Sequence, residues 1–516
     1  MATRSGIGTQ AGIETPGWRV LSILLLAYIF NFLDRQILSI LQIPIQRELA
    51  LNDEQLGLMG GVAFALLYSG LGVPIAWLAD RKDRVKIIAV SLAVWSAFTA
   101  LCGAAQNFWQ LFLARMGVGV GEAGGVAPAY ALISDYFPPE RRARAMAIFS
   151  LGIPIGTSLG VFFGGWLASS VDWRFAFALV GGLGLLLVPL MLLGIRDPGR
   201  GRFDRVDGKP VEPAPPFLTV MKCLARKPTF WLLSFGAACG SILGYGFAFW
   251  LPQFLTRTRG LELMDISWFY GSIALIGGVG GIWLGGVVGD RMGSIRPSGY
   301  PLIPAICFLI AAPLYTAAIY VPSLTLSWFM IVLATAFGLA WLGPVIAAVQ
   351  LIVPPNMRAS SSASFLLINN LIGIGFGIWF IGKLSTLLTP AYGQDALQHA
   401  MFYALGFYLL SALLYFLAAK RLPMDLPDRD PGEGAALRGR GTKRLIGGIA
   451  LSVLLFVFVD KVGGFGLECY YVGGLSPETL CIKGSVYRGA WVVAAGLTAW
   501  GAYAAWKYRI IGRPRS

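Results

Sequence analysis

The sequence predicts an all-α polytopic membrane protein, built from two parallel six-helix halves and two extra C-terminal transmembrane helices. Of its 516 residues, 56% are hydrophobic and only 13% are charged, whereas soluble domains carry roughly 25% charged residues. Apolar stretches of about 20 residues match a hydrocarbon core of roughly 30 Å. Twelve such stretches lie within residues 18–420, and two more lie near 445–460 and 486–506. A soluble fold is therefore excluded.

The formal net charge of +15 is explained by the predicted topology. Lysine and arginine cluster in alternate connections, such as Arg81-Lys82-Asp83-Arg84, Arg141-Arg142-Ala143-Arg144 and the loop 196–227. Cytoplasmic loops of membrane proteins carry this excess of positive charge. We therefore expect both termini and the 196–227 loop in the cytoplasm, a location in a bacterial inner membrane, and no nucleic-acid partner.

Motifs of the first half return in the second. Asp80-Arg81 is matched by Asp290-Arg291, and Pro138-Pro139 is matched by Pro354-Pro355. Both copies of each motif fall on the predicted cytoplasmic side, so the halves have the same orientation, as in transporters built from parallel repeats. The predicted organisation is an N-terminal six-helix lobe, a cytoplasmic linker, a C-terminal six-helix lobe, a second cytoplasmic linker and an extra two-helix hairpin, at residues 1–195, 196–227, 228–420, 421–444 and 445–516.

Two carboxylates, Asp34 and Glu122, lie deep inside apolar stretches, and each has an arginine close by in sequence, Arg35 and Arg115 respectively. Such charges are costly in a bilayer and mark pathways, proton relays or counter-ions of a substrate. With a rise of roughly 1.5 Å per residue, Asp34 and Arg115 fall at comparable depths, so a salt bridge between them is feasible. Adjacent helical residues point about 100° apart, so Asp34 and Arg35 are not both expected to face one cavity.

The run from Asp80 to Lys86 resembles the signature between the second and third helices of the major facilitator superfamily. Its aspartate is expected to cap a neighbouring helix, and Arg81 and Arg84 are expected to pair with carboxylates across the two halves. A clamp that holds in one conformation biases the equilibrium between conformations. We therefore interpret the following residues as a conformational gate: Asp80, Arg81, Arg84, Asp290 and Arg291.

One helix carries glycines at four-residue spacing, and this face resembles the superfamily's fifth-helix motif. Small residues on one face let two helix backbones approach closely. The residues are Gly152, Gly156, Gly160 and Gly164. In the Asp80 motif, by contrast, the superfamily's leading glycine is replaced by Ala76, whereas the second copy keeps Gly286.

Within this superfamily, the chain looks like the Spinster lipid transporters over about residues 18–420. The resemblance rests on Asn31-Phe32-Leu33-Asp34-Arg35 and on the segment from Arg115 to Ala123. It implies the major facilitator fold, alternating access, and proton-linked or gradient-driven movement of lysophospholipids or sphingosine phosphate. The expected partners are a lipid or amphipathic substrate, the proton and the bilayer, and the expected state is a monomer.

We expect Asp34, Glu122 and Arg115 to carry proton coupling, with Arg115 the firmer candidate for an anionic headgroup. The second half has Ile331 and Gly338 at the positions equivalent to Arg115 and Glu122, so its candidates are polar or aromatic and suit the tail of an amphipathic ligand. The predicted substrate-binding residues are Arg115, Arg35, Asn31, Tyr245, Phe249, Trp341, Asn369 and Asn370.

Other functions stay open at this point. A fold alone fixes no substrate, so a small organic anion or drug-like compound is the alternative cargo. A lipid channel or scramblase would need no titratable pair. No zinc-type motif, serine–histidine arrangement or Cys-x-x-Cys is present, which argues against an enzyme and predicts no cofactor and no metal. Cys469 and Cys481 fall in the loop predicted to lie outside and are a candidate disulfide.

Overall fold

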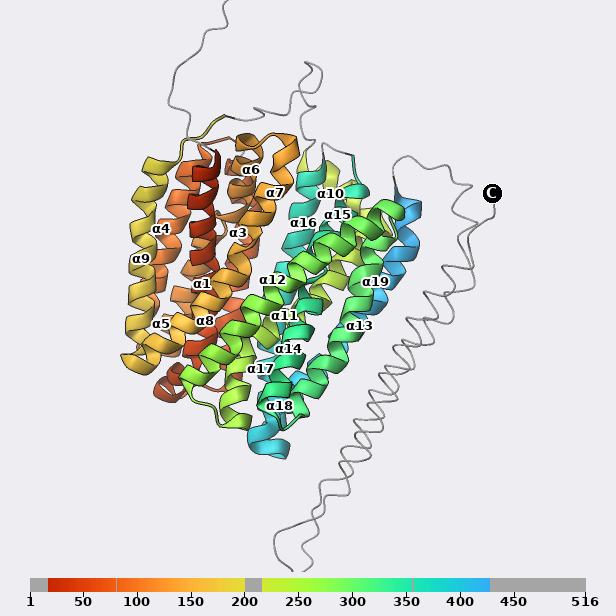
Figure 1. Cartoon of the computed structure of the whole chain (residues 1–516). Coiled ribbons are helices and arrows are strands. Elements are labelled where there is room, and N and C mark those ends of the chain that lie inside the picture. The colour runs from red at the N-terminus through yellow and green to blue at the C-terminus, as the bar shows by residue number, and fades with distance from the viewer. Residues whose placement is uncertain (1–16, 80, 200–215, 355–356, 427–516) are drawn as a thin grey trace, which may run out of the picture. The chain divides into compact units, whose positions relative to one another are not determined.

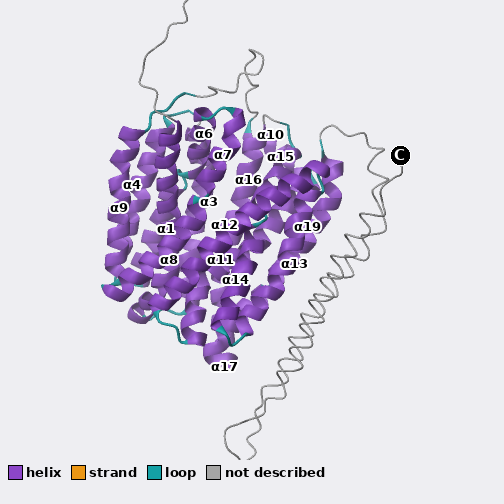
Figure 2. Cartoon of the chain, viewed as in Figure 1, coloured by secondary structure: helices purple, strands orange, loops and turns teal. Residues whose placement is uncertain are grey.

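The computed structural model describes residues 17–79, 81–199, 216–354 and 357–426, and every regular element among them is helical (Figure 2). The predicted all-α membrane fold is confirmed for this part of the chain. The predicted hairpin at 445–516, its Cys469–Cys481 pair and the gate residue Asp80 lie outside the described residues.

The chain divides into two compact units (Figure 1). Unit 1 combines Met1–Leu51 with Ala63–Glu212, and unit 2 combines Asn52–Val62 with Pro213–Ser516. Unit 1 contains α1 Gly17–Leu49, α3 Ala63–Ala79, α4 Arg84–Cys102, α5 Phe108–Glu122, α6 Val126–Tyr136, α7 Pro139–Ser150, α8 Gly152–Ser170 and α9 Trp173–Gly194. The predicted boundaries of the lobes and linkers stay predictions.

Unit 2 begins with a short segment taken from the chain of the first half. Its helices are α2 Asp53–Gly57, the π-helix η1 Leu58–Val62, α10 Phe217–Ala225, α11 Pro228–Arg259, α12 Leu263–Ile295, α13 Gly299–Tyr320, α14 Leu324–Leu339, α15 Leu342–Leu351, α16 Arg358–Asn370, the π-helix η3 Leu371–Phe376, α17 Gly377–Tyr392, the short 3-10 turn η4 Gly393–Asp395, α18 Ala396–Ala404 and α19 Gly406–Asp425.

Among the described residues, eleven helical stretches are long and apolar enough to cross a membrane. The last of them, Ser360–Asp425, has 66 residues, about three times the length that one crossing needs. Gly393, with a φ of 55°, ends α17 and starts a turn into α18, so this stretch contains two helical segments that are each long enough for one crossing. The eleven stretches therefore account for the twelve predicted between residues 18 and 420.

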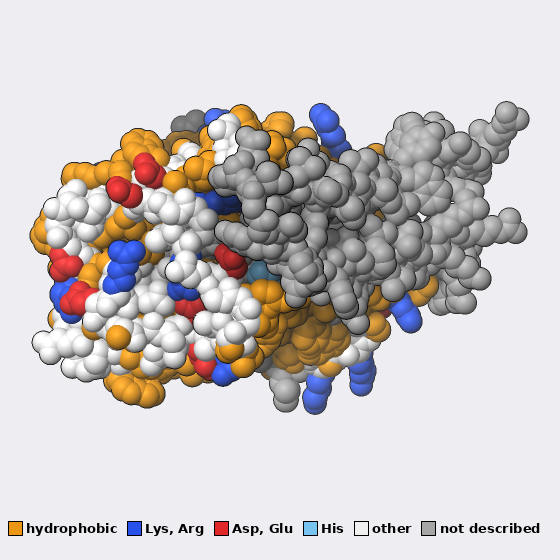
Figure 3. Space-filling model, turned by 90° about the horizontal axis from the view of Figure 1, so that it is seen from below, with side chains coloured by type: hydrophobic (Ala, Val, Ile, Leu, Met, Phe, Trp, Pro, Cys, Tyr) orange, Lys and Arg blue, Asp and Glu red, His pale blue; other side chains and the backbone are white. Residues whose placement is uncertain are grey.

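Apolar side chains face outward, as a lipid environment requires. Leu193 on α9 and Trp283 on α12 are among the exposed large hydrophobic residues. On the face shown in Figure 3, hydrophobic side chains cover much of the coloured surface, with some acidic and basic side chains among them. A helix can present such a surface to lipid because its backbone groups are hydrogen-bonded internally.

The segment Asn52–Val62 is held in unit 2 by charge and by close backbone contact. Asp53 receives two hydrogen bonds from Arg257, at 2.6 and 2.7 Å, and one from Ser385 at 2.7 Å. Nearby, Lys383 pairs with Glu54 at 2.8 Å. The two π-helices also meet here, because a Cβ added at Gly61 would lie 2.9 Å from the carbonyl oxygen of Gly375. This contact therefore needs glycine in η1.

In unit 1, the glycine face of α8 packs directly on α1. A Cβ at Gly160 would lie 2.6 Å from the backbone oxygen of Leu33, and a Cβ at Gly164 would lie 2.7 Å from the side chain of Ile37. The predicted role of this glycine face is thus confirmed. It brings α8 against the part of α1 that carries Asp34, so close packing positions a buried charge.

We expect Gly160→Ala to destabilise the protein by about 1–3 kcal/mol, because the new methyl group meets backbone that has no room to move. The matched control is Gly182→Ala on α9, where an added Cβ meets nothing within 4 Å. Alanine has the higher helix propensity, so the control should be neutral or slightly stabilising. Thermal unfolding of both purified variants in detergent measures the difference. Equal melting temperatures would contradict the close contact.

Candidate functional site

Unit 1 buries a cluster of four charged side chains contributed by α1 and α5. Asp34 and Arg115 are each 2% exposed, and Glu122 is fully buried. Arg35 completes the cluster, with 11% of its side chain exposed. The structure thus brings together the three residues predicted for proton coupling and one further arginine.

The ion pair of this cluster joins Arg35 to Glu122. Arg35 Nε donates to Glu122 Oε2 at 2.5 Å. Asn31, one turn earlier on α1, is buried, and its side-chain amide has no hydrogen-bond partner among the described residues. The salt bridge considered between Asp34 and Arg115 does not form among the described residues. Because neighbouring residues of α1 point about 100° apart, Arg35 reaches α5 while Asp34 faces α4.

Asp34 is held by a residue that the sequence analysis missed. Thr99 of α4 donates a hydrogen bond from Oγ1 to Asp34 Oδ2 at 2.6 Å. The second carboxylate oxygen, Oδ1, has no hydrogen-bond partner among the described residues. A threonine in an apolar helix gives no signal by itself, since threonine also occurs at purely structural positions, so only the fold identifies this contact.

Aromatic rings surround the two arginines. The Arg35 guanidinium carbon lies 5.1, 4.8 and 4.5 Å from the ring centres of Phe32, Phe64 and Tyr68. Arg115 lies 5.7 Å from the Phe64 ring. Cation–π attraction of this kind strengthens when the cation is removed from water. This attraction partly compensates for the hydration energy that the buried guanidinium groups have lost.

The guanidinium of Arg115 is not fully hydrogen-bonded. Its Nε and Nη1 are buried and have no hydrogen-bond partner within the part of the chain that the structure describes. A buried guanidinium without acceptors is costly, and it is the arrangement expected where an external anion supplies the missing acceptors. This arrangement makes Arg115 a candidate for binding an anion.

Glycines of α5 make room for the cluster. A Cβ at Gly119 would lie 2.6 Å from the Phe64 backbone oxygen, and one at Gly121 would strike the backbone of Trp95. The glycine-rich run before Glu122 therefore allows α3 and α4 to approach α5.

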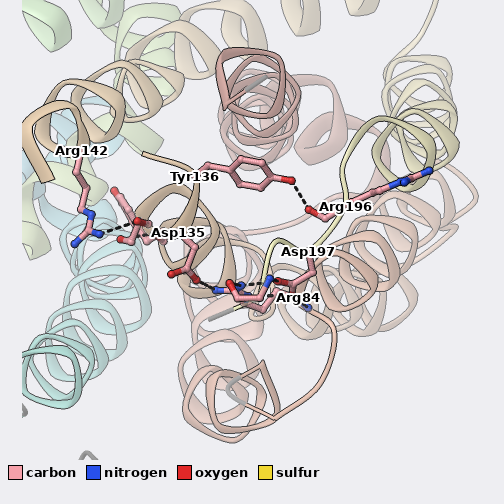
Figure 4. Close-up of polar contacts among 9 residues, drawn as sticks. Arg84, Asp135, Tyr136, Arg142, Arg196 and Asp197 are labelled. Carbon is pink, nitrogen blue, oxygen red and sulfur yellow. Dashed lines mark hydrogen bonds and ion pairs between the residues drawn. The ribbon is translucent and has the colours of Figure 1, made fainter. Parts of the chain in front are cut away.

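A second charged cluster surrounds Arg84 at the start of α4 (Figure 4). Its Nη1 donates to Asp135 Oδ2, and its Nε and Nη2 donate to the two oxygens of Asp197 at 3.0 and 2.5 Å. Nη2 also donates to the Gly199 carbonyl at 3.1 Å. All these partners belong to unit 1, so the expectation that Arg84 pairs across the halves is corrected.

The other gate residues have local roles in the structure. Asp83 caps α4 by accepting from the backbone amides of Val85 and Lys86. Arg81 donates to the Trp77 carbonyl and lies 3.9 Å from the Trp77 ring centre. In the second copy of the motif, Asp290 and Arg291 are both exposed side chains near the end of α12.

The candidate residues of unit 2 fall into two groups. Asn369 accepts a hydrogen bond from Ser241 at 2.8 Å and donates to Asn370 at 3.3 Å. These asparagines end α16, immediately before the π-helix η3. The aromatic candidates are Tyr245, which is half-buried, and Phe249 and Trp341, which are buried.

The buried aromatic residues of unit 2 have structural neighbours. The Phe249 ring covers Gly60 of η1, and Trp341 packs edge-on against Phe365 at 6.4 Å between ring centres. Their burial fits the interpretation as ordinary core residues as well as a role in binding.

The environment of Asp197 makes the Arg84 cluster sensitive to acid. Burial by itself would raise the pKa of Asp197, but the hydrogen bonds and charge of Arg84, with the backbone amides of Arg84 and Gly199, hold that pKa below its ordinary value. The Tyr136 hydroxyl also donates a hydrogen bond to the Arg196 carbonyl. The chain that leaves α9 is thus attached to α4 and α6.

Comparisons with known proteins match this architecture. The family model of the Major Facilitator Superfamily matches residues 24–378. An MFS-type efflux pump of Mycolicibacterium smegmatis is 34% identical over 431 residues, which cover 81% of this chain and 98% of the relative. Human protein spinster homolog 1 is 29% identical over 429 residues, which cover 79% of this chain and 80% of the relative.

Two crystal structures of a bacterial homolog to the human lysosomal transporter Spinster are also similar. The inward-facing, unoccupied form has a TM-score of 0.73 at 32% identity, and the inward-facing, occupied form has a TM-score of 0.69 at 31% identity. Each match covers 81% of this chain and all of the solved chain. The resemblance inferred from the motifs around Asp34 and Glu122 is therefore confirmed.

We expect Asp197→Asn to lower the free energy of unfolding at pH 7 by roughly 1 kcal/mol, and with it the melting temperature. A carboxyl whose pKa is lowered by folding stabilises the protein above its ordinary pKa of 3.8, and this contribution is lost as the pH falls through the lowered value. The difference in melting temperature between the parent protein and the variant should therefore become smaller below about pH 4.

Thermal unfolding in detergent from neutral pH down to about pH 3 checks this expectation. The control is Asp172→Asn at the start of α9, because Asp172 makes no side-chain capping bond. A gap that stays constant over the whole range would refute the assigned role of Asp197.

Proposed function

Because this chain belongs to the major facilitator superfamily, whose members are transporters and not enzymes, we propose that it is a proton-coupled secondary transporter of an amphipathic anion. The chain is a multi-pass integral membrane protein of Spinster type. The proposed cargo is a lysophospholipid or a sphingosine-phosphate-like lipid. The proposal includes a monomer in a bacterial inner membrane, with both termini in the cytoplasm.

The observation that carries the proposal is the buried Arg115 guanidinium without hydrogen-bond acceptors at Nε and Nη1 among the described residues. A phosphate group supplies acceptors in the bidentate geometry that a guanidinium prefers. Arg115 is therefore the proposed first contact of an anionic headgroup. Asn31 and Arg35 lie in the same cluster and are the proposed additional contacts.

Proton coupling follows from the two buried carboxylates. Protonation of Glu122 neutralises the carboxylate that Arg35 contacts. The cluster then carries an excess positive charge, which favours an anionic headgroup beside Arg115. A carboxylate prefers its proton when it loses water and releases it when a cation approaches, so the protonation of Asp34 and Glu122 depends on conformation.

The remaining candidate residues have supporting roles in this proposal. Tyr245, Phe249 and Trp341 are proposed for the apolar tail because of their aromatic chemistry, and Asn369 and Asn370 for polar contacts. The residues Asp80, Arg81, Arg84, Asp290 and Arg291 stay the proposed conformational gate, with Arg84 acting inside unit 1.

A second cargo is favoured by one comparison. The Mycolicibacterium smegmatis relative is described as an efflux pump, which supports a small organic or drug-like compound as the alternative. A lipid channel or scramblase is a further alternative, and it would move lipid without a proton gradient. One assay separates these functions.

We expect proteoliposomes of the parent protein to move a fluorescent lysophosphatidylglycerol in response to an imposed pH gradient, followed by extraction of the probe with albumin. Asp34→Asn and Glu122→Gln should each abolish gradient-driven movement, since neither amide can carry the proton. The control is Asp265→Asn, an exposed aspartate of α12. Full gradient-driven movement in the double variant would refute the assignment of the coupling residues.

The other outcomes of this assay identify the alternatives. Movement of the lysolipid by the parent protein at the same rate with and without a gradient would identify a channel or scramblase. Gradient-driven efflux of a small dye, together with no movement of the lysolipid, would identify the drug-like cargo.

We expect Arg115→Lys to weaken binding of the same lysolipid about 10-fold or more, because lysine presents a point charge and cannot bind phosphate in bidentate fashion. Equilibrium binding to the detergent-purified protein measures the affinity. Arg144→Lys, at an exposed position of α7, is the matched control. Unchanged affinity in both Arg115→Lys and Arg115→Ala would point to a neutral substrate.

A further inference from the structure

Thr99 makes the one hydrogen bond that Asp34 receives within the described part of the chain. Its side chain is fully buried, and its Oγ1 lies 2.6 Å from Asp34 Oδ2. The contact joins α4 to α1, two helices far apart in sequence. No motif or charge pattern singles out this threonine, and the transport site proposed above does not include it.

The surroundings of Asp34 leave few other groups able to respond to its charge. From α5, Glu122 and Arg115 act on it electrostatically, and Arg35 acts from its own helix. From α4, the titratable neighbour is the thiol of Cys102. From α8, the helix that packs most closely on α1, the residues facing this stretch are glycines. Thr99 is thus the neutral polar group in direct contact with the carboxylate.

We propose that Thr99 is a positioning residue that sets the pH at which Asp34 takes up and releases its proton. This inference rests on the proposed function only for its consequence in transport. The contact itself is a property of the fold and is testable without any substrate.

A hydroxyl suits both protonation states of a carboxyl group. With Asp34 ionised, Thr99 donates its proton into the hydrogen bond with Oδ2. With Asp34 protonated at Oδ2, the acid proton is donated to Thr99 Oγ1. The threonine proton then turns to the backbone carbonyl one turn earlier, that of Trp95, which is a common threonine contact in helices. No proton leaves the threonine, so Thr99 adjusts the exchange without taking part in it.

The donated hydrogen bond favours the charged form of the carboxylate. Thr99→Val keeps the shape of the side chain and removes the donor, so the uptake of the proton should occur at higher pH. A hydrogen bond to a charged acceptor corresponds to a shift of roughly one pH unit. Thr99→Ser keeps the hydroxyl and should return the transition close to its position in the parent protein.

Infrared difference titration of the purified full-length protein tests the contact directly. The band of the protonated Asp34 carboxyl group is identified by its absence in Asp34→Asn. We expect its midpoint to move up by roughly one pH unit in Thr99→Val and to return in Thr99→Ser. Thr316→Val is the control, because Thr316 is a buried threonine of α13 that bonds to its own helix at Ala312.

An unchanged midpoint in Thr99→Val would overturn the inference, and so would a shift of equal size in Thr99→Ser. A shift in Thr316→Val would show a non-specific effect and would overturn it as well. Valine keeps the shape of threonine but lacks its hydroxyl group, whereas serine keeps the hydroxyl group but lacks the methyl group. A folding defect common to both variants therefore cannot produce the expected pattern.

The pH dependence of lysophosphatidylglycerol movement in proteoliposomes then separates this inference from the proposed function. If the parent protein responds to pH and the Thr99→Val profile moves up with the infrared midpoint, both are supported. If the infrared midpoint moves but the parent protein shows no response to a gradient, proton coupling fails and the role of Thr99 at Asp34 remains supported. If transport by Thr99→Val keeps the profile of the parent protein, the consequence inferred for Thr99 fails alone.

Discussion

The lack of water in the hydrocarbon core is the constraint from which this structure follows. Backbone groups satisfy one another inside helices, but buried side-chain charges need partners on neighbouring helices. Unit 1 places two carboxylates and two guanidinium groups among α1, α4 and α5, and the glycines of α5 and α8 bring these helices close enough for contact. The ion pair of Arg35 with Glu122 and the hydrogen bond of Thr99 with Asp34 are direct results of that close packing.

The charge count of this cluster explains how it can respond to a proton. Two acids and two bases balance when both acids are ionised, so uptake of one proton leaves an excess positive charge in a site with little water. Under the proposed function, an anion entering beside Arg115 restores the balance. Proton uptake and anion binding would then favour each other, and a conformation that exposes the cluster to one side of the membrane would exchange both.

The sequence was sufficient to predict the helical membrane fold and the residues of the cluster. A charge within a long apolar stretch usually marks a functional site, and glycine at every fourth position indicates close packing of helices. The pairing within the cluster was not predictable. Asp34 and Arg115 lie at comparable depth, but the rotation of α1 turns Asp34 to Thr99 and Arg35 to Glu122. The acidic partners of Arg84 stand in polar or boundary segments, where a carboxylate gives no signal, and only the fold brings them to that arginine.

Two buried arginines of unit 1 differ in how fully the fold satisfies their hydrogen bonds. Each of the three side-chain nitrogens of Arg84 donates to an acceptor on Asp135, Asp197 or Gly199, so this guanidinium is tied to the fold at every nitrogen. Arg115 has comparable burial but leaves Nε and Nη1 without acceptors among the described residues. Folding tolerates such a loss only where the rest of the structure is strong enough to bear it. The glycines of α5 bring α3 and α4 close to the helix that carries Arg115, and the proposed function assigns the missing acceptors to an anion.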